Sequence, residues 1–280
     1  MSAQSHPSLS VSIVCFNTAA DELQMLLASL ATNLQQLNDT IPNFSSGIWL
    51  VDNSDQQPVT GEELALYREK LAGSEARLEL IQGHGNIGYG AAHNLAINKS
   101  KATYHLLLNP DVVLEESCLL YGLTFLVDNA EVVMVSPAAK DNQGEKQYLN
   151  KRYPSVGLFL ARGFFPAWLQ RPFKKSLDTF EMRDLPEDRA SKGIPIISGC
   201  FMLCRREALW QVENFDERYF LYFEDFDLSL RMAGVGELAY LPTMRIQHGG
   251  GNSAGKGLAH IRMFARSGYR FFSTHGWRFF

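Results

Sequence analysis

The stretch SVSIVCF, from Ser10 to Phe16, is a short and largely apolar run that predicts a buried strand. The segment that follows carries leucines at helical spacing: Leu23, Leu26, Leu27, Leu30, Leu34 and Leu37. A buried strand followed at once by an amphipathic helix is a β-α unit. This pattern predicts an α/β fold.

Three further strands are predicted in the first 140 residues, at 48–51, 78–81 and 104–108. Polar residues follow two of them. Asp52 to Asp55 comes directly after the second strand, and Asn109-Pro110-Asp111 comes after the fourth. Because open parallel α/β sheets bind ligands beyond the carboxyl ends of their strands, we expect a ligand site at this edge.

Length and composition predict a globular protein. At 280 residues with 46% hydrophobic content, the chain is long enough to bury a large core. It holds no run of about eighteen apolar residues, and its first residues do not resemble a signal peptide, so we expect a cytoplasmic location. The four cysteines form no C-x-x-C pair, which predicts reduced core thiols and argues against a zinc site.

The periodicity fails from Asp141 to Gly193, where aromatic and basic residues are mixed. The segment is too apolar for a disordered linker, so we predict a mobile, acceptor-facing insertion at about 141–193 within a domain of residues 1–255. Residues 256–280 form a basic, aromatic helix or tail. No Asp or Glu occurs from Leu238 to Phe280, although the whole chain has a net charge of -4.

Three carboxylates in four positions, Glu224, Asp225 and Asp227, open a predicted helix directly after an aromatic run. The helix dipole favours acids there, whereas packing beside phenylalanines partly desolvates them and raises the pKa toward that of a general base. An acidic first turn of an ordinary helix is the alternative. Asp227 and Arg231 are spaced i,i+4, which predicts an ion pair.

Gly83 to Gly88 matches G-x-G-x-x-G between a predicted strand and a predicted helix at 91–98, and Asp111 lies about twenty residues on. The pattern raises the alternative of an NAD-dependent oxidoreductase. However, that fingerprint belongs in the first β-α turn of its unit, and here two β-α units precede it. A tight strand-to-helix turn is the simpler interpretation.

The turn Asn109-Pro110-Asp111 places a carboxylate at the mouth of a buried strand, where it suits a divalent cation that bridges phosphate oxygens. A capping turn is the alternative. His248 precedes a glycine-rich run in the acid-free region, from which it would reach a metal or a diphosphate.

Several of these segments, in their order along the chain, resemble the inverting glycosyltransferases of family 2, and in particular the rhamnosyltransferase-like members that build bacterial O-antigen, capsule and cell-wall glycans. The resemblance covers nearly everything outside the insertion and rests on these motifs: Ser12 to Asn17, Val51 to Ser54, Asn86 to Asn94, Leu108 to Val112, Gly199 to Leu209, Asn214 to Glu217, Phe223 to Leu228, and His248. It implies the GT-A nucleotide-diphospho-sugar transferase fold: α/β and Rossmann-like, with a mostly parallel central sheet and helices on both faces.

The resemblance implies a role for each matching residue. Asp52 would read the pyrimidine base of the nucleotide. The nucleotide cleft would be lined by Asn17, Asn86, Gly88, Asn109 and Asp111. Asp111, aided by His248, would also hold Mg²⁺ or Mn²⁺ on the diphosphate. Many relatives carry Asp where this chain has Asn109, and an amide is a poorer metal ligand, which puts tight metal dependence in doubt.

Asp225 matches the family's catalytic base, with Glu224 beside it as a positioning or tuning group. The implied reaction moves a sugar from a nucleotide donor to a lipid-linked saccharide acceptor in bacterial surface polysaccharide synthesis, with L-rhamnose from dTDP-L-rhamnose as the leading hypothesis. A UDP-sugar donor is the alternative within the family. A non-catalytic nucleotide-sugar-binding protein, motivated by Asn109, and the NAD-dependent oxidoreductase are the alternatives of other classes.

Arg262, Arg266 and Arg270 recur every four residues in the tail, and apolar bulk is supplied by Phe264, Phe271, Phe272 and Trp277. Such a segment would lie peripherally on the anionic inner face of the cytoplasmic membrane and gather a polyprenyl-diphosphate acceptor. The alternative is a helix that packs on the domain and presents a solvated basic face. No nucleic-acid motif accompanies the charge, so no nucleic-acid partner is predicted.

Overall fold

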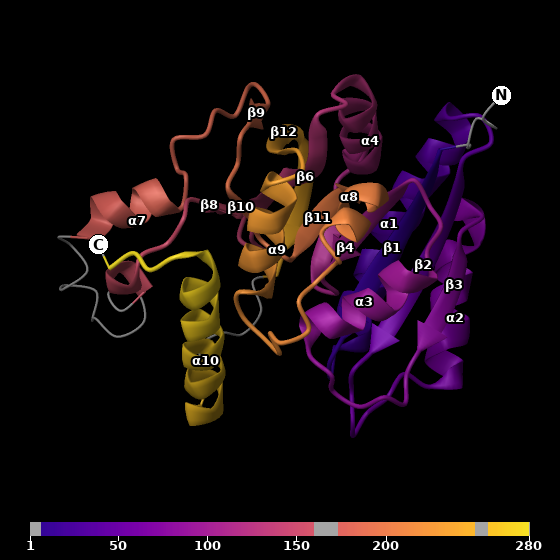
Figure 1. Cartoon of the computed structure of the whole chain (residues 1–280). Helices are drawn as coiled ribbons and strands as arrows, with labels where there is room; N and C mark the ends of the chain where they lie inside the picture. The colour runs from indigo at the N-terminus through magenta and orange to yellow at the C-terminus, as the bar shows by residue number, and fades with distance from the viewer. Residues whose placement is uncertain (1–6, 160–172, 250–256, 280) are drawn as a thin grey trace.

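The computed structural model describes residues 7–159, 173–249 and 257–279 (Figure 1). Its helices and strands are, in chain order, β1 Ser8–Cys15, α1 Ala20–Thr40, β2 Ser45–Asp52, α2 Gly61–Leu71, β3 Arg77–Ile81, α3 Tyr89–Lys99, β4 Tyr104–Leu108, β5 Val112–Leu114, α4 Cys118–Asp128, β6 Val132–Lys140, β7 Lys146–Gln147, β8 Asn150–Lys151, α7 Lys174–Phe180, β9 Ser191–Lys192, β10 Ile196–Ile197, β11 Phe201–Arg205, α8 Arg206–Gln211, α9 Glu224–Ala233, β12 Glu237–His248 and α10 Leu258–His275.

Most of the described strands build one large sheet, whose main path runs in the order β3-β2-β1-β4-β11-β6-β12-β5, and β8 and β10 form a separate two-stranded sheet. The first four strands are parallel to one another, and β6 and β12 are also parallel to each other. Only β11 and β5 run against their neighbours on this path. The predicted mostly parallel sheet is therefore confirmed, and the carboxyl ends of β1, β2 and β4 share one edge.

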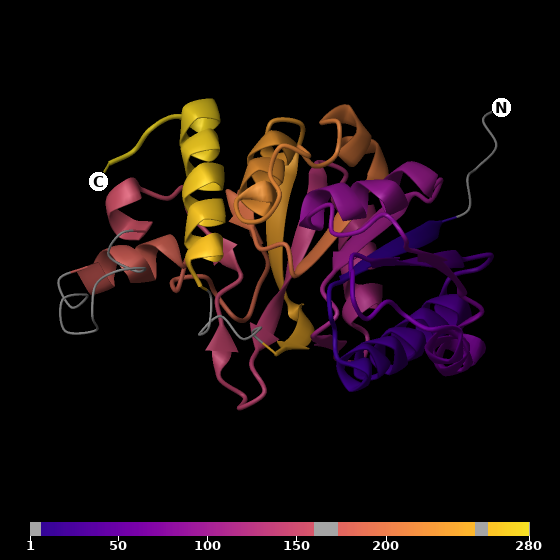
Figure 2. The ribbon, with the colours of Figure 1, turned by 90° about the horizontal axis from the view of Figure 1, so that it is seen from below.

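Helices cover both faces of the sheet, as predicted (Figure 2). The alternation of side chains along β4 connects the two layers. Leu106 and Leu108 pack with the leucines of α1 and α4 on one face. Leu107 points to the other face, where it packs with Leu209 of α8 and Leu228 of α9. All of these leucines are buried, and burial of each such side chain contributes about 1.5–3 kcal/mol.

The predicted strands at 48–51, 78–81 and 104–108 lie within β2, β3 and β4. The run from Ile194 to Cys204 does not form one continuous strand. Ile196–Ile197 pairs with β8, whereas Phe201–Arg205 joins the main sheet, so the three residues between them form a loop beside α9. All four cysteines are free and buried, which agrees with the prediction of core thiols.

The predicted insertion at about 141–193 is only partly within the described residues, since 160–172 lie outside them. Its described parts are not separate from the domain. β7 pairs with β6 and β9 pairs with β12, so both extend the central sheet.

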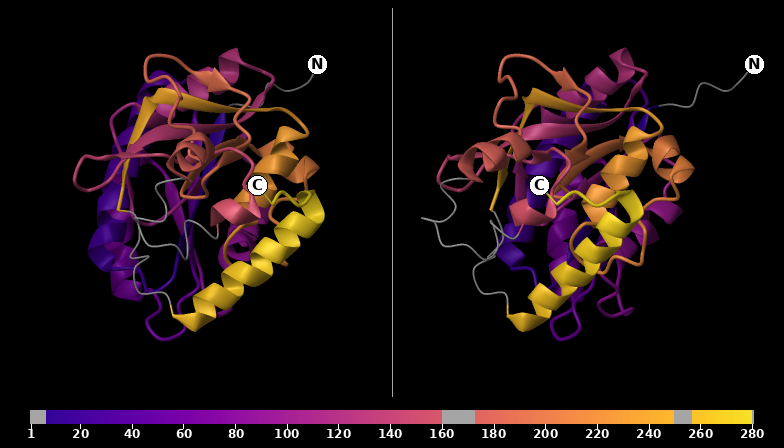
Figure 3. Two further views of the ribbon diagram at one scale, coloured as in Figure 1. Left: turned by 90° about the vertical axis from the view of Figure 1, so that its left-hand side faces the viewer. Right: turned by 60° about the vertical axis from the view of Figure 1, so that its left-hand side comes forward.

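The C-terminal helix α10 lies alongside α9 (Figure 3). Phe271 and Phe272 are buried, and they pack together with Phe223, Phe226 and Phe264. The phenylalanines of this helix thus face the domain and leave Arg262 and Arg266 outward, whereas Arg270, which was predicted on the same basic face, lies over the ring of Tyr219. Within the described ranges no helix is both long and apolar enough to cross a membrane.

Candidate active site

The first turn of α9 follows two strained residues. Tyr222 and Phe223 have φ values of 70° and 67°, in the left-handed region that bulky side chains rarely adopt. Packing holds them there, because the Phe223 ring lies 5.0 Å from that of Phe264 and 5.3 Å from that of Phe271. The Ser267 hydroxyl also donates to the carbonyl oxygen of Leu221 at 2.9 Å. Helix α10 therefore fixes the turn that presents the acidic pair.

Asp225 is placed as a hydrogen-bonded, half-buried carboxylate. Its Oδ2 accepts a hydrogen bond from the Gly199 amide at 3.0 Å, and its Oδ1 accepts one from the Phe226 amide at 2.9 Å. Burial raises the pKa of Asp225, while these two bonds and the positive charge of Lys151 act in the opposite direction. The two hydrogen bonds hold the carboxylate in place, and its raised pKa makes it a stronger base.

Glu224 lies in a different environment. Its side chain is buried, and Oε2 has no hydrogen-bond partner among the described residues. Burial raises the pKa of Glu224 well above its usual range, and the adjacent charge of Asp225 raises it further. The two neighbouring carboxyls thus lie in unequal surroundings: burial favours the protonated form of Glu224, whereas backbone hydrogen bonds favour the anion of Asp225.

Asp111 and His248 come together at the same edge of the sheet. His248 ends β12 opposite Val112 of β5, and its Nε2 lies 3.5 Å from Oδ2 of Asp111. On its other side, Nδ1 of His248 lies 2.8 Å from Oε1 of Gln147. If that nitrogen carries the proton, Nε2 presents a lone pair toward Asp111. This is how a neutral histidine is oriented as a metal ligand.

These two side chains fit a divalent cation of a particular kind. No group of three or more His, Cys, Asp or Glu residues within the described ranges is placed to hold a metal. Mg²⁺ needs only one or two protein ligands when it also binds phosphate oxygens and water. Asp111 with His248 meets that requirement only in company with a diphosphate.

Asn109 does not face this pair in the way a second metal carboxylate would. Its Oδ1 lies 2.9 Å from the hydroxyl of Tyr89, which also lies 2.7 Å from the carbonyl oxygen of Gly199. The amide at position 109 is thus engaged in a hydrogen bond to a neutral phenol.

Asp52 and Asn17 lie together where β1 and β2 end. Both oxygens of Asp52 accept backbone hydrogen bonds, from Ser54 at 2.9 Å and from Val59 at 2.7 Å, and the side chain is 2% exposed. The backbone amide of the exposed Asn17 donates to the Ser54 hydroxyl at 2.8 Å. Asp52 therefore shapes the loop at 53–59, and its reading of a base stays a prediction.

Asn86 and Gly88 organise the turn into α3. Oδ1 of Asn86 accepts from the Gly88 amide at 3.1 Å, which closes a local turn. Gly88 has φ of +92°, and a Cβ atom there would lie 2.5 Å from the carbonyl oxygen of Phe220. The glycine run follows β3, at the outer edge of the sheet, and serves this close packing. The dinucleotide fingerprint instead needs the first β-α turn of its unit.

Asp227 forms the ion pair that its i,i+4 spacing from Arg231 predicted. It pairs with Arg231 at 2.7 Å, and its other oxygen lies 2.7 Å from Nε2 of His275. The second contact, which sequence reasoning missed, joins α9 to α10.

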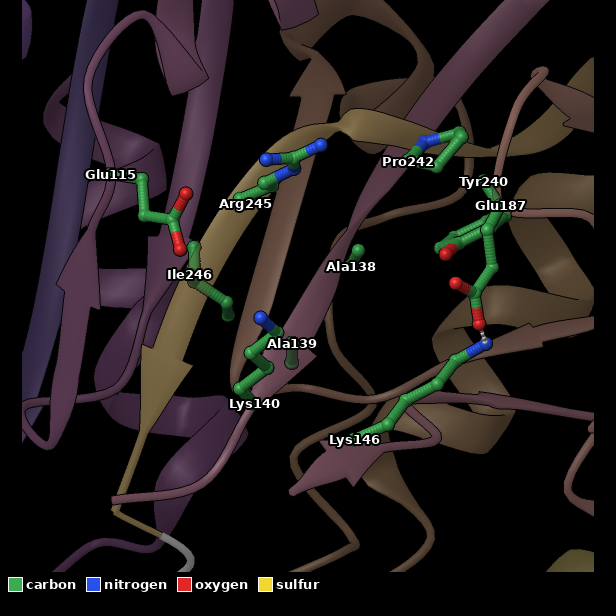
Figure 4. A pocket seen from close by; sticks show the side chains of 10 residues that line it. All are labelled: Glu115, Ala138, Ala139, Lys140, Lys146, Glu187, Tyr240, Pro242, Arg245 and Ile246. Atoms are coloured by element: carbon green, nitrogen blue, oxygen red, sulfur yellow. Dashed lines mark hydrogen bonds and ion pairs between the residues drawn. The ribbon is translucent and has the colours of Figure 1, made fainter. Parts of the chain in front are cut away.

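A pocket of about 280 Å³ opens along β6 and β12 (Figure 4). Lys146 reaches across it to Glu187, with 2.6 Å between Nζ and Oε1. None of the predicted site residues lines this pocket. The pocket is therefore separate from both the acidic pair and the Asp111–His248 pair.

The sequence profile of glycosyl transferase family 2 matches residues 10–213. The chain belongs to that family.

The chain is also similar to two curated relatives and to one solved structure. The chain is 28% identical over 222 residues to N-acetylglucosaminyl-diphospho-decaprenol L-rhamnosyltransferase of Mycobacterium tuberculosis, covering 71% of this chain and 69% of the relative. It is 25% identical over 193 residues to rhamnosyltransferase WbbL of Escherichia coli, covering 66% and 69%. The mannosyltransferase of Pyrobaculum calidifontis, solved with GDP-Man and Mn²⁺, superposes with a TM-score of 0.58 at 15% identity, over 90% of this chain and 59% of that one.

These findings identify a glycosyltransferase of the GT-A fold and a rhamnosyltransferase-like member of family 2. The oxidoreductase alternative is therefore wrong. The last glycine of the pattern that suggested it, Gly88, is required by its tight packing under Phe220.

Proposed function

We propose that the protein is an inverting transferase that moves L-rhamnose from dTDP-L-rhamnose to a lipid-linked saccharide acceptor during synthesis of a bacterial surface polysaccharide. The observation that carries the proposal is the unequal pair at the start of α9, in which two backbone amides hold Asp225 beside the buried Glu224. The rhamnosyltransferase names of the relatives support the sugar and the lipid-linked acceptor.

The reaction needs one base and one stabilised leaving group. Asp225 takes the proton from an acceptor hydroxyl as its oxygen attacks the anomeric carbon, and the bond from that carbon to the nucleoside diphosphate breaks. Attack from the side opposite the leaving group inverts the anomeric configuration. Asp111 and His248 would hold Mg²⁺ or Mn²⁺, which when bound stabilises the negative charge on the diphosphate.

A UDP-sugar is the second candidate donor. A single methyl group on the pyrimidine separates dTDP from UDP, and such a difference changes binding by only about 1–3 kcal/mol. In either case we assign recognition of the pyrimidine ring to Asp52, and binding of the diphosphate to Asn109, Asp111 and their neighbours. The non-catalytic alternative rested on Asn109, and the hydrogen bond of that residue with Tyr89 gives the amide a role of its own.

The outward face of α10 supports a peripheral membrane contact on the cytoplasmic side. Arg262 and Arg266 are exposed, and beside them lie the exposed side chains of Leu258, Ile261 and Tyr269. Each basic residue near an anionic surface contributes about 1 kcal/mol, and apolar side chains next to them enter the headgroup region. The apolar contribution would come from these residues rather than from the buried Phe271 and Phe272.

The donor is tested by measuring binding of dTDP-L-rhamnose, dTDP, UDP, GDP and NAD by calorimetry with Mg²⁺ present. We expect dTDP and its sugar to bind more tightly than GDP and NAD. The anomeric configuration of the product, read by NMR from transfer to a synthetic lipid-linked acceptor, tests the mechanism. Retention of configuration, or tight binding of NAD alone, would contradict the proposal.

A further inference from the structure

Tyr89, the first residue of α3, lies between the two halves of the candidate site. Its hydroxyl oxygen is 2.9 Å from Oδ1 of Asn109 and 2.7 Å from the carbonyl oxygen of Gly199. Asn109 belongs to the turn that carries Asp111. The amide of Gly199 donates to Oδ2 of Asp225 at 3.0 Å. One phenol therefore touches both the diphosphate side and the segment that holds the base.

The ring of Tyr89 is held firmly. It meets His93 edge to face at 4.5 Å and Phe215 at 6.2 Å between centroids. His93 is itself fixed, because its Nδ1 lies 2.6 Å from the Ser12 hydroxyl on β1 and its ring is fully buried. The hydroxyl is thus set at a constant position relative to the central sheet.

The hydroxyl has one proton and two neighbouring oxygens. Turning the Asn109 amide lets its NH₂ group donate to Tyr89, while Tyr89 donates to the Gly199 carbonyl, so all three groups are satisfied. Burial raises the pKa of Tyr89 well above its usual value, with nearby acidic groups adding to the effect. The phenol therefore stays protonated and remains a donor.

We propose that Tyr89 is a positioning residue that sets the orientation of Gly199, so that the Gly199 amide points at Asp225, and that couples this orientation to the Asn109 turn. The inference rests on the proposed transfer reaction, in which Asp225 is the base. A carboxylate at position 109 would place a charge against a phenol already surrounded by acidic groups, whereas the amide suits the link.

Loss of the link has a defined effect on the base. A hydrogen bond from Gly199 favours the anion of Asp225, so its weakening raises the pKa of that carboxyl. The acid limb of the pH profile then moves to higher pH, and the loss of activity shrinks as the pH rises. The titratable groups that face Asp225 are Glu224 on the same helix, Lys151 on β8, Cys200 before β11 and Tyr89 itself.

The test is Tyr89→Phe, which removes one oxygen and keeps the ring packing. We expect kcat to fall about tenfold at pH 6.5, with the acid limb of kcat/KM displaced upward by about half a unit or more. Tyr67→Phe is the matched control, since Tyr67 is a buried tyrosine on α2, and its profile should remain that of wild type. A uniform loss across pH, or an unmoved acid limb, would overturn the proposal.

Gly199→Ala disturbs the same link from its other end, because a Cβ there would lie 3.3 Å from Cβ of Asp225 and 3.3 Å from Cε1 of Tyr89. It should displace the acid limb in the same direction, and it serves if Tyr89→Phe does not fold. A ¹³C NMR titration of the Asp225 carboxyl gives a readout that needs no turnover. An upward shift in either variant supports the link even if the donor is not dTDP-L-rhamnose, and an unchanged titration contradicts it.

Discussion

Oδ2 of Asp111 lies 3.5 Å from Nε2 of His248, because the antiparallel pairing of β5 with β12 brings the two residues to one edge of the sheet. Gln147 holds the other nitrogen of the imidazole at 2.8 Å. We propose that these two residues hold a divalent cation whose coordination is completed by a diphosphate and water.

Asp111→Ala should weaken donor binding in the presence of Mg²⁺ by at least about tenfold, since a carboxylate ligand of the cation is lost. Residual transfer should no longer respond to Mg²⁺ or Mn²⁺. Calorimetry of the donor with and without metal measures the first effect. Glu116→Ala, which removes an exposed carboxylate nearby in the chain, is the control. A metal titration like that of wild type would refute the assignment of Asp111 as a ligand.

Glu224→Gln should change how stability depends on pH. The folded pKa of Glu224 is raised above its unfolded value, so wild type is most stable, as far as this group is concerned, below the unfolded pKa and loses stability as pH rises through the folded pKa. Glutamine does not ionise. The free energy of unfolding of the variant, measured with denaturant, should therefore gain on that of wild type between pH 5 and pH 8, by about 1.4 kcal/mol for each unit of pKa shift. An equal difference between variant and wild type at both pH values would show that Glu224 is not buried as a protonated acid.

Arg262→Gln with Arg266→Gln should reduce binding to vesicles that contain anionic lipid, and wild-type binding should itself weaken with salt. Arg270→Gln is the matched control, because the Arg270 guanidinium lies 5.8 Å from the ring of Tyr219 and faces the domain. Cosedimentation measures the binding, and transfer to a water-soluble acceptor should be unchanged. Unaltered vesicle binding in the double variant would rule out this face of α10.

Gly88→Ala should destabilise the fold by at least about 2 kcal/mol, because the new Cβ atom would lie 2.5 Å from the carbonyl oxygen of Phe220. Gly83→Ala separates the two causes. Gly83 also has a positive φ, of +88°, but nothing lies within 4 Å of its Cβ position, so only the conformational cost of about 1–2 kcal/mol remains. Denaturant unfolding measures both. Equal losses of unfolding free energy in the two variants would mean that the close approach of Gly88 to Phe220 does not contribute to the cost.

Strands β1 to β4 and helices α1 and α3 could be predicted because their apolar periodicity is local, whereas α2, α4, β5 and β6 were not predicted. The split between β10 and β11 could not, since it depends on the pairing of Ile196–Ile197 with β8 and on the loop beside α9. The core thiols and the Asp227–Arg231 ion pair followed from composition and spacing, and both are confirmed.

The site was harder to predict in its details. Glu224 and Asp225 stood out as acids beside aromatic residues, but which of the two keeps the proton depends on the Gly199 amide, a contact between distant residues. Tyr89 and Gln147 carried no signal of their own, since each acts through a neighbour. For the same reason the sequence could not show that α10 supports the strained turn before Glu224.

The most direct test of the account is the turnover of Asp225→Asn beside its affinity for the donor. Because the base acts only in the transition state, kcat for sugar transfer should fall at least about a hundredfold while the dissociation constant for the nucleotide sugar stays near that of wild type. Glu224→Gln should retain most of its activity at pH 7. Near-normal turnover of Asp225→Asn, or a loss in Glu224→Gln as large as that in Asp225→Asn, would contradict the assignment of Asp225 as the base.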